Sequence, residues 1–527
     1  MTTIAVDLNT KPVALRRTLS WAGAFWIVSG IAPLVLFSIG AVGAIAGKMS
    51  WLIWVVSMLI GLVQSVVFAE IAAMHPKHAG GVAVHAGIAW KRYGKPLAPL
   101  CPWAYWVGWT VVLAVGSSLA AGYILSLLLP PDAAARVWQL QFLDLSFLKT
   151  GLTVRINLVS ILAFVLLVAT FWIQHRGILL TSKIQKILAV ATLVPLLLVS
   201  LAPLFTGAVP RDHFLPLVPS IHNAQGGVTD GSWNLAGITA IAAGLFIAGW
   251  STYGVETAAC FTREFKVPRK DTARSIGAVA VLCLLFYTLV PLTFQGVLGL
   301  EGLNRSEIND GSGVGLVLAG MLPAWPYTAN IIVAILVLAL FLSMTSIMAG
   351  SARTLYQSSV EGWFPRYLSR TNRQGSPTYA MATDLAVNAC LLLLSDSMFV
   401  LAAANVCYMV FVFLALNALW ILRRDCPQED RPFRMPTWAL VFAPLLAFLN
   451  AFLIGMGAGS YGRGTLLTGL VVLLAIFPVI ALQHFRPGTP KVTPAPEVIS
   501  PASGKWPWIT LILGVMTVYA GFLVARN

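Results

Sequence analysis

The stretch Ala248-Gly249-Trp250-Ser251-Thr252-Tyr253-Gly254-Val255-Glu256 lies inside an apolar run that extends over residues 236–260. Two glycines, two hydroxyl groups and two aromatic rings precede a single carboxylate. Glycine lets a chain leave helical geometry, and an acid inside an apolar segment is costly and therefore a functional candidate. Irregular backbone at membrane depth is tolerated only where it lines a cavity or is buried in protein. The stretch therefore predicts an interrupted membrane helix with a binding site at the interruption.

Outward from this stretch, composition agrees with a membrane location. Of the 527 residues, 58% are hydrophobic and only 10% are charged, whereas a soluble domain carries about 25% charged residues. Apolar runs of the roughly 20 residues that cross a bilayer recur along the chain. These numbers exclude a soluble enzyme, a coiled coil, a secreted disulfide scaffold and a disordered tail. The thirteen predicted spans are 22–46, 51–74, 97–129, 156–174, 184–206, 236–260, 275–299, 327–350, 378–395, 398–421, 437–458, 465–485 and 507–525.

The distribution of basic residues predicts the orientation of these spans. With a cytoplasmic N-terminus, 26 of the 34 lysines and arginines fall in cytoplasmic segments and 8 fall outside. This bias follows the positive-inside rule and accounts for the net charge of +15 without nucleic acid as a partner. An odd number of spans then places the C-terminus outside. We expect no cleavable signal peptide and no disulfide among the six cysteines, most of which lie in or beside apolar spans.

Motifs for chemistry are scarce. The chain has no P-loop, no GxGxxG and no HExxH motif. His75, His78 and His85 cluster in one predicted loop, where we interpret them as solvated histidines because no cysteine or acidic residue completes a ligand set. The sequence therefore predicts no catalytic residue, no metal site and no cofactor, and it argues against an ATP-driven pump or a membrane enzyme.

A second interruption is predicted in the first span, at Ser29-Gly30-Ile31-Ala32-Pro33. Proline removes an amide donor, and discontinuous helices are used in pairs by transporters at the middle of the membrane. We therefore expect both breaks, near Ser29–Pro33 and Gly249–Tyr253, to meet there. Two alternatives stay open: a simple proline kink in the first span, and a structural ion pair of Glu256 with Arg263.

Four groups of motifs resemble the amino acid–polyamine–organocation (APC) superfamily of permeases over about residues 20–485. They are Tyr253–Glu256 with Phe261–Asp271; Ala69-Glu70-Ile71 with Gly80-Gly81 and Trp103-Ala104-Tyr105-Trp106; Ser351–Tyr356 with Glu361–Pro365 and Gly375-Ser376-Pro377; and Arg431–Pro436. The resemblance implies an all-α polytopic membrane protein with a LeuT-type 5+5 inverted-repeat fold and additional C-terminal helices. The apolar runs predict about thirteen transmembrane helices, and the thirteenth is extra relative to the twelve that are common in the family. It also implies that Trp250 covers a bound substrate, that Glu256 takes part in proton-sensitive gating, and that Trp109 faces the site.

Two positions depart from the family pattern. The usual first break, Gly-Ser/Thr-Gly, is replaced by Ile31-Ala32-Pro33, and proline has no amide to offer a substrate carboxylate. Many sodium-independent members carry a lysine on the fifth helix, and Thr192 aligns near that position. The expected substrate-binding residues are Ser29, Gly30, Ile31, Ala32, Trp109, Gly249, Trp250, Ser251, Thr252, Tyr253 and Gly254. A candidate ion site comprises Thr192, Ser343, Thr345 and Ser346, although small-residue packing explains the last three equally well.

The sequence thus predicts a secondary active transporter of the cytoplasmic membrane that moves an amino acid or a related organic amine, coupled to H⁺ or Na⁺. The alternative within this class is a carrier of the polyamine, choline or ethanolamine type, and a channel is disfavoured because polar residues concentrate at two breaks. The predicted parts are a cytoplasmic segment (1–20), a transporter domain (21–485), a cytoplasmic linker (486–506) and an extra helix (507–527).

Overall fold

The computed structural model describes residues 15–130, 132–222, 228–309, 311–322, 325–484 and 504–526. Most of the predicted linker 486–506 and most of the segment 1–20 lie outside these ranges. The α-helices are α1 (Trp21–Val28), α2 (Val35–Ala46), α3 (Ser50–Met74), α4 (Gly81–Lys91), α5 (Leu97–Leu128), α6 (Ala134–Val137), α7 (Leu158–His175), α8 (Ile178–Thr206), α9 (Leu235–Thr252), α10 (Pro268–Leu303), α11 (Ser306–Asn309), α12 (Val314–Gly320), α13 (Thr328–Val360), α14 (Thr378–Leu391), α15 (Ser397–Asp425), α16 (Ala439–Gly457), α17 (Thr465–Leu474), α18 (Ile476–His484) and α19 (Trp506–Arg526).

Short 3₁₀ helices and two hairpins complete the fold. The 3₁₀ helices are η1 (Ser29–Leu34), η2 (Gly47–Met49), η3 (Arg211–His213), η4 (Gly254–Glu264), η5 (Arg366–Ser369) and η6 (Ala458–Tyr461). The strands β1 (Gln139–Asp144) and β2 (Thr153–Asn157) pair antiparallel with Leu140 opposite Ile156, and β3 (Ser220–His222) pairs antiparallel with β4 (Val228–Asp230).

Side-chain caps define where several of the long helices begin. The Ser20 side chain accepts a hydrogen bond from the amide of Gly23 at the start of α1, and Asn234 caps α9 in the same way. Asn157 forms a capping box with Ser160 at α7, and Asp396 caps α15. Such caps satisfy amides that the first turn of a helix leaves unpaired.

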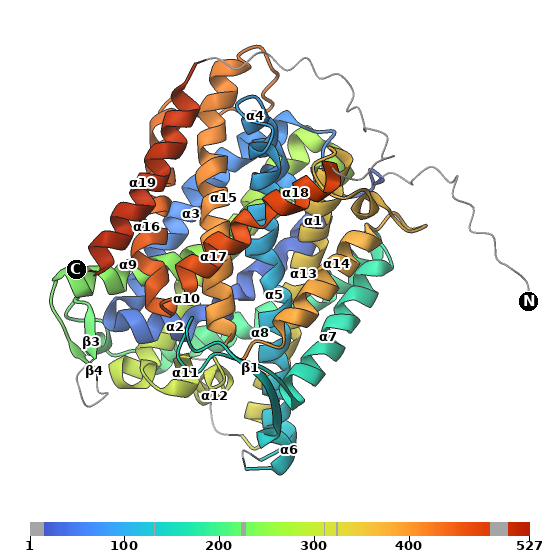
Figure 1. The fold of residues 1–527 in the computed structure, drawn as a ribbon. Helices are drawn as coiled ribbons and strands as arrows, with labels where there is room; N and C mark the ends of the chain where they lie inside the picture. Colours follow the sequence, from blue (N-terminus) through green and yellow to red (C-terminus); the bar gives the residue numbers. More distant parts are fainter. Residues whose placement is uncertain are drawn as a thin grey trace, which may run out of the picture.

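The helices form one bundle around α5 and α15 (Figure 1). α5 packs against both α13 and α15, and α15 is buried along almost its entire length. The last helix, α19, packs on α16 at the edge of the bundle and leaves most of its surface exposed. An α-helix therefore forms where the extra C-terminal span was expected.

Ten helical segments within the described residues are long and apolar enough to cross a membrane. One of them, Trp21–Met74, contains two of the predicted spans, while Thr465–Ala481 and the 14-residue α14 are shorter. The polytopic all-α class is confirmed, and the count of thirteen spans stays a prediction.

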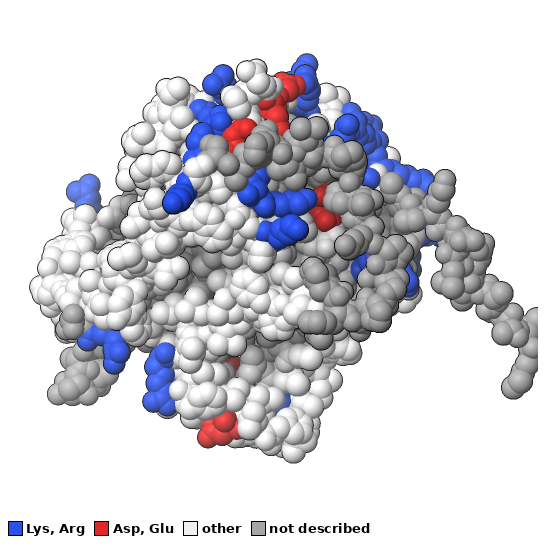
Figure 2. All heavy atoms as spheres, turned by 45° about the horizontal axis from the view of Figure 1, so that its top comes forward, with Lys and Arg blue, Asp and Glu red and all other residues white. Residues whose placement is uncertain are grey.

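Lysines and arginines gather at one end of the bundle, which we call the basic end. It contains the C-terminal ends of α3, α4 and α15 with the loop after α15, and it lies at the top of Figure 1. Figure 2 brings this end forward and shows basic side chains spread over the upper part of the view. The interpretation of the histidines here as solvated is wrong for two of them, because His75 is 9% exposed and His85 is fully buried.

A backbone link joins two distant segments at the start of α1. Leu19 and Phe265 form an isolated parallel bridge. The Leu19 amide donates to the Glu264 carbonyl at 3.0 Å, and the Lys266 amide donates to the Leu19 carbonyl at 2.8 Å. The chain entering the first interrupted helix is therefore hydrogen-bonded to the chain leaving the second.

Candidate functional site

The first predicted interruption is present as a change from α-helical to 3₁₀ geometry, whereas the stretch predicted for the second is α-helical through Thr252 and the change to 3₁₀ geometry follows it. The first one occupies η1, between α1 and α2, and includes Pro33. The second begins later than predicted, because α9 continues through Gly249 to Thr252 and η4 starts at Gly254. A 3₁₀ helix of more than a few residues is uncommon and often marks a hinge or strain. With eleven residues, η4 is much longer than an ordinary 3₁₀ helix, and we interpret it as a hinge or a strained segment.

One tyrosine from α10 ties the two interruptions together. The Tyr287 hydroxyl is 2.8 Å from the Ile31 carbonyl of η1 and 3.1 Å from the Ser251 carbonyl of α9. Its ring stacks on Trp54 of α3 at a centroid distance of 5.7 Å. The two breaks are thus neighbours in space, because one hydroxyl lies within hydrogen-bond distance of a carbonyl from each.

Two glycines permit close approaches at this junction. A Cβ atom on Gly30 would lie 2.2 Å from Ser346 Oγ and 2.5 Å from the Leu342 carbonyl of α13. A Cβ atom on Gly254 would lie 2.6 Å from the Trp109 ring. Since real Cβ contacts do not come this close, larger residues would push η1 from α13 and η4 from α5.

An aromatic box surrounds the carboxylate of Glu256. Glu256 Oε1 accepts hydrogen bonds from Trp109 Nε1 at 3.1 Å and from the Tyr408 hydroxyl at 3.0 Å. The Trp109 ring contacts the rings of Trp250 at 5.6 Å and Tyr408 at 4.9 Å, measured between centroids. Trp250 is held by a 2.9 Å hydrogen bond from Nε1 to the Gly108 carbonyl. The four residues come from α5, α9, η4 and α15, and each is at most 1% exposed.

The second carboxylate oxygen of Glu256, Oε2, lacks the hydrogen bonds that Oε1 has. Glu256 Oε2 is buried and has no hydrogen-bond partner, and no basic side chain pairs with Glu256 within the described residues. Arg263, the partner considered from the sequence, donates to Gln357 Oε1 instead. A buried acceptor without a partner costs free energy. The box therefore presents an unsatisfied acceptor to a proton or to a cationic group of a ligand, beside rings that can also face a cation.

Other predicted residues have local partners. The hydroxyls of Ser251 and Thr252 donate to a carbonyl of α9, and Thr252 also contacts Ser57 of α3 at 2.7 Å. The Ser29 hydroxyl donates to the Trp26 carbonyl of the preceding α1. Gly249 packs against Met409 and the Tyr253 ring. The junction therefore brings together Ile31, Trp109, Trp250, Gly254 and Glu256, while Ala32 is buried in η1 without any contact that sets it apart.

Of the candidate ion residues, two hydrogen-bond only within their own helix and two also accept a hydrogen bond from another helix. Ser343 donates to the Ala339 carbonyl, and Thr192 donates to the Leu188 carbonyl of α8. Thr345 and Ser346 also bond to their own helix, but their oxygens accept from Gln185 Nε2 at 3.1 and 3.3 Å. Gln185, two turns before Thr192 on the same face of α8, is thus the residue that hydrogen-bonds to the α13 hydroxyls. The ion site itself stays a prediction.

Sequence reasoning missed Tyr287 and Gln185 and gave Tyr408 no role. Tyr287 lies inside an apolar helix, where one hydroxyl among hydrophobic neighbours is a weak signal. Its contact with Ile31 spans 256 residues, so no local pattern shows it.

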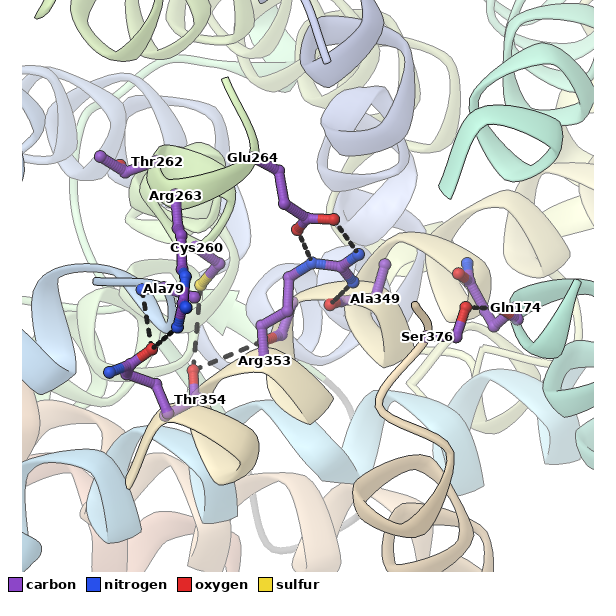
Figure 3. A network of polar contacts seen from close by, with 12 residues as sticks. Ala79, Gln174, Cys260, Thr262, Arg263, Glu264, Ala349, Arg353, Thr354 and Ser376 are labelled. Carbon is purple, nitrogen blue, oxygen red and sulfur yellow. Dashed lines mark hydrogen bonds and ion pairs between the residues drawn. The ribbon is translucent and has the colours of Figure 1, made fainter. Parts of the chain in front are cut away.

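A second polar cluster lies where the end of η4 meets α13 (Figure 3). Arg353 of α13 donates through Nε and Nη2 to both oxygens of Glu264, the last residue of η4. Arg353 also donates to the Ala349 carbonyl and lies 4.7 Å from the Phe261 ring centroid. The side chains of this pair are only 4% and 2% exposed. The end of η4 is therefore fixed to α13 by a buried, fully paired salt bridge.

Comparison with known proteins identifies the family. A family model for amino acid permeases matches residues 19–465. The amino-acid permease RocE of Bacillus subtilis is 25% identical over 395 residues, covering 71% of this chain and 75% of RocE. The lysine-specific permease LysP of Lactococcus lactis is 23% identical over 409 residues, covering 75% of each. The predicted resemblance is confirmed: this chain belongs to the amino acid permease family, and it is an amino acid transporter embedded in the membrane.

Proposed function

We propose that this transporter carries its amino acid through the junction of η1 and η4 by alternating access, without converting it chemically. The observation that carries the proposal is the unpartnered Glu256 Oε2 inside the box of Trp109, Trp250 and Tyr408. A substrate ammonium group there would satisfy the acceptor and lie against aromatic faces. The relatives are named as amino acid permeases, including a lysine-specific one, so the alternative of an organocation carrier is not favoured.

Glu256 is also the proposed link to the driving ion. We propose that the coupling ion is a proton, since an acid that lacks a basic partner can take up charge only by exchanging a proton or receiving a cation. No other cofactor is proposed. The charge distribution supports a cytoplasmic N-terminus in the cytoplasmic membrane, with the basic end facing the cytoplasm.

The first test is transport by the purified protein in proteoliposomes against a panel of amino acids, with Trp250→Leu as the variant. Leucine keeps bulk but removes the aromatic face, which contributes about 2 kcal/mol to a desolvated cation. We therefore expect binding of the transported amino acid to weaken about tenfold or more.

Trp172→Leu is the matched control, because Trp172 lies on α7 and is 57% exposed. This variant should bind like the wild type. Equal affinity of Trp250→Leu and wild type would place the substrate away from this ring. Failure of every amino acid to be transported would reject the proposed substrate class.

A further inference from the structure

A pocket of about 420 Å³ opens at the basic end, on elements that do not build the aromatic box. Its wall contains His75 at the end of α3 and Arg92 at the end of α4. Its rim contains Arg269 of α10 with Glu429 and Asp430 from the loop after α15. This volume lies within the roughly 300–1,000 Å³ of small-molecule sites.

The wall holds donors of hydrogen bonds that lack acceptors. Arg92 Nε and Nη1 are buried and have no hydrogen-bond partner within the described part of the chain, and neither has His75 Nε2. Unsatisfied buried donors are expensive, above all on a charged group. Nε–H and Nη1–H point along different edges of the guanidinium, so each can donate its own charge-assisted hydrogen bond to an oxygen of a carboxylate or a phosphate. The wall is therefore complementary to an acceptor that the protein itself does not supply.

The charges around the pocket favour an anion at this point. Asp430 is paired with Arg269 at the rim, whereas Arg92 forms no ion pair with a described residue. Glu429 is exposed at the rim, where water screens it. Arg92 is half-buried with its Nε and Nη1 atoms enclosed, and it is the positive charge of the pocket wall that has no ion-pair partner among the described residues.

Two further histidine rings lie close to the ring of His75. The ring centroids of His85 and His78 lie 5.0 and 5.8 Å from that of His75. Burial, with the charges of His78 and Arg92, lowers the pKa of His75 to about 3, and burial lowers the pKa of His85 well below its usual value. Both rings are therefore neutral at physiological pH, and each still offers one N–H donor.

A metal ion is the other occupant that clustered histidines suggest. Within the described residues, no group of three histidine, cysteine, aspartate or glutamate side chains has an arrangement that could hold one. Arg92 beside His75 would also repel a cation. The unpaired donors and the adjacent guanidinium together point to an anionic ligand instead.

We propose that this pocket binds a small oxyanion, a carboxylate or a phosphate, through Arg92 and His75. The site is separate from the transport site and does not depend on the proposed role of Glu256. The oxyanion comes either from a soluble small molecule or from the head group of an anionic lipid, since the basic end carries the positive charge that attracts both.

The test uses the full-length protein in nanodiscs made only of zwitterionic phosphatidylcholine. Unfolding temperature is measured during titration with inorganic phosphate or N-acetylglycine, a carboxylate without an ammonium group, and with sodium chloride at matched ionic strength. A ligand that binds only the native state raises this temperature in a saturable manner. A parallel series replaces part of the lipid with phosphatidylglycerol and contains no added anion.

We expect saturable stabilisation by phosphate or N-acetylglycine if the source is soluble, and by phosphatidylglycerol if it is a lipid. Arg92→Gln should weaken the effect about tenfold, because a charge-assisted bond contributes roughly 1.5–3 kcal/mol. Arg366→Gln, which removes an exposed arginine of η5, should leave it unchanged. Trp250→Leu should also retain it, which separates this pocket from the transport site.

If Arg92→Gln does not yield folded protein, Arg92→Lys decides, because it keeps the charge and loses the planar fork. Its anion response should be weaker than that of the wild type. Stabilisation no greater than that by sodium chloride, or an identical response of wild type and the folded Arg92 variant, would overturn the proposal.

Discussion

Two glutamates that lie eight residues apart on the same 3₁₀ helix differ in how their carboxylate oxygens are paired. At the end of η4, both oxygens of Glu264 are paired with Arg353. Near its start, Glu256 has one oxygen in neutral hydrogen bonds and one without a partner. Both acids are nearly fully buried. Burial alone therefore does not indicate a functional acid; the informative feature is a buried carboxylate whose neighbours leave it incomplete.

The largest loss of stability is expected when Glu264 is substituted. Glu264→Gln leaves Arg353 as a buried charge without its counterion, which typically costs about 3–5 kcal/mol. We expect a large fall in unfolding temperature, measured by thermal denaturation in detergent.

The exposed pair of Arg269 and Asp430 supplies the control, since both side chains are 63% exposed. Asp430→Asn should change stability by only about 0–1 kcal/mol because water screens the pair. Similar losses in both variants would contradict the view that burial makes the Glu264 pair essential.

Substitution of Tyr287 is expected to lower stability by less than substitution of Glu264 and by more than substitution of Glu256. Tyr287→Phe removes the hydroxyl shared by the Ile31 and Ser251 carbonyls and keeps the stacked ring. Leaving buried acceptors unsatisfied should cost about 1–3 kcal/mol, and the altered contact between the breaks should change the transport rate. Tyr519→Phe, on the exposed face of α19, should be neutral in both thermal denaturation and transport assays.

The smallest effect on stability is expected for Glu256. Glu256→Gln keeps a carbonyl oxygen for Trp109 and Tyr408 and removes the charge, so unfolding should change by less than about 1 kcal/mol. If protonation of Glu256 drives gating, transport by this variant should lose its pH dependence while ligand binding persists.

Uptake across a pH series, with binding measured in parallel, checks this prediction. Glu301→Gln, an exposed acid at the far end of α10, should keep the wild-type pH profile. A wild-type pH profile in Glu256→Gln would make Glu256 a structural hydrogen-bond acceptor.

The same comparison shows what the sequence could predict. Glycine and proline mark both interruptions because these residues act locally, on the backbone that carries them. The exact start of the second one escaped prediction, since Gly249 serves close packing against Met409 and leaves α9 intact. Trp250 and Glu256 stood out because an indole between two glycines, followed closely by an acid, is unusual in an apolar helix.

Partners distant in the sequence could not be predicted. Whether Glu256 pairs with an arginine depends on where α13 places Arg353, and only the fold brings Arg353 to Glu264 rather than to Glu256. Gln185 illustrates the related problem of register. Two helical turns separate it from Thr192, so both lie on the same face of α8, and an alignment without coordinates cannot tell which of the two lies level with the α13 hydroxyls.

The backbone bridge between Leu19 and Phe265 has a consequence for how this protein tolerates mutation. Its two hydrogen bonds involve the main chain of Leu19, Glu264 and Lys266, so they do not depend on any side chain. The beginning of one broken helix and the end of the other can thus remain connected while the residues themselves diverge. Alanine scanning of this segment would miss the connection, whereas proline at position 19 or 266 would remove one of its donors.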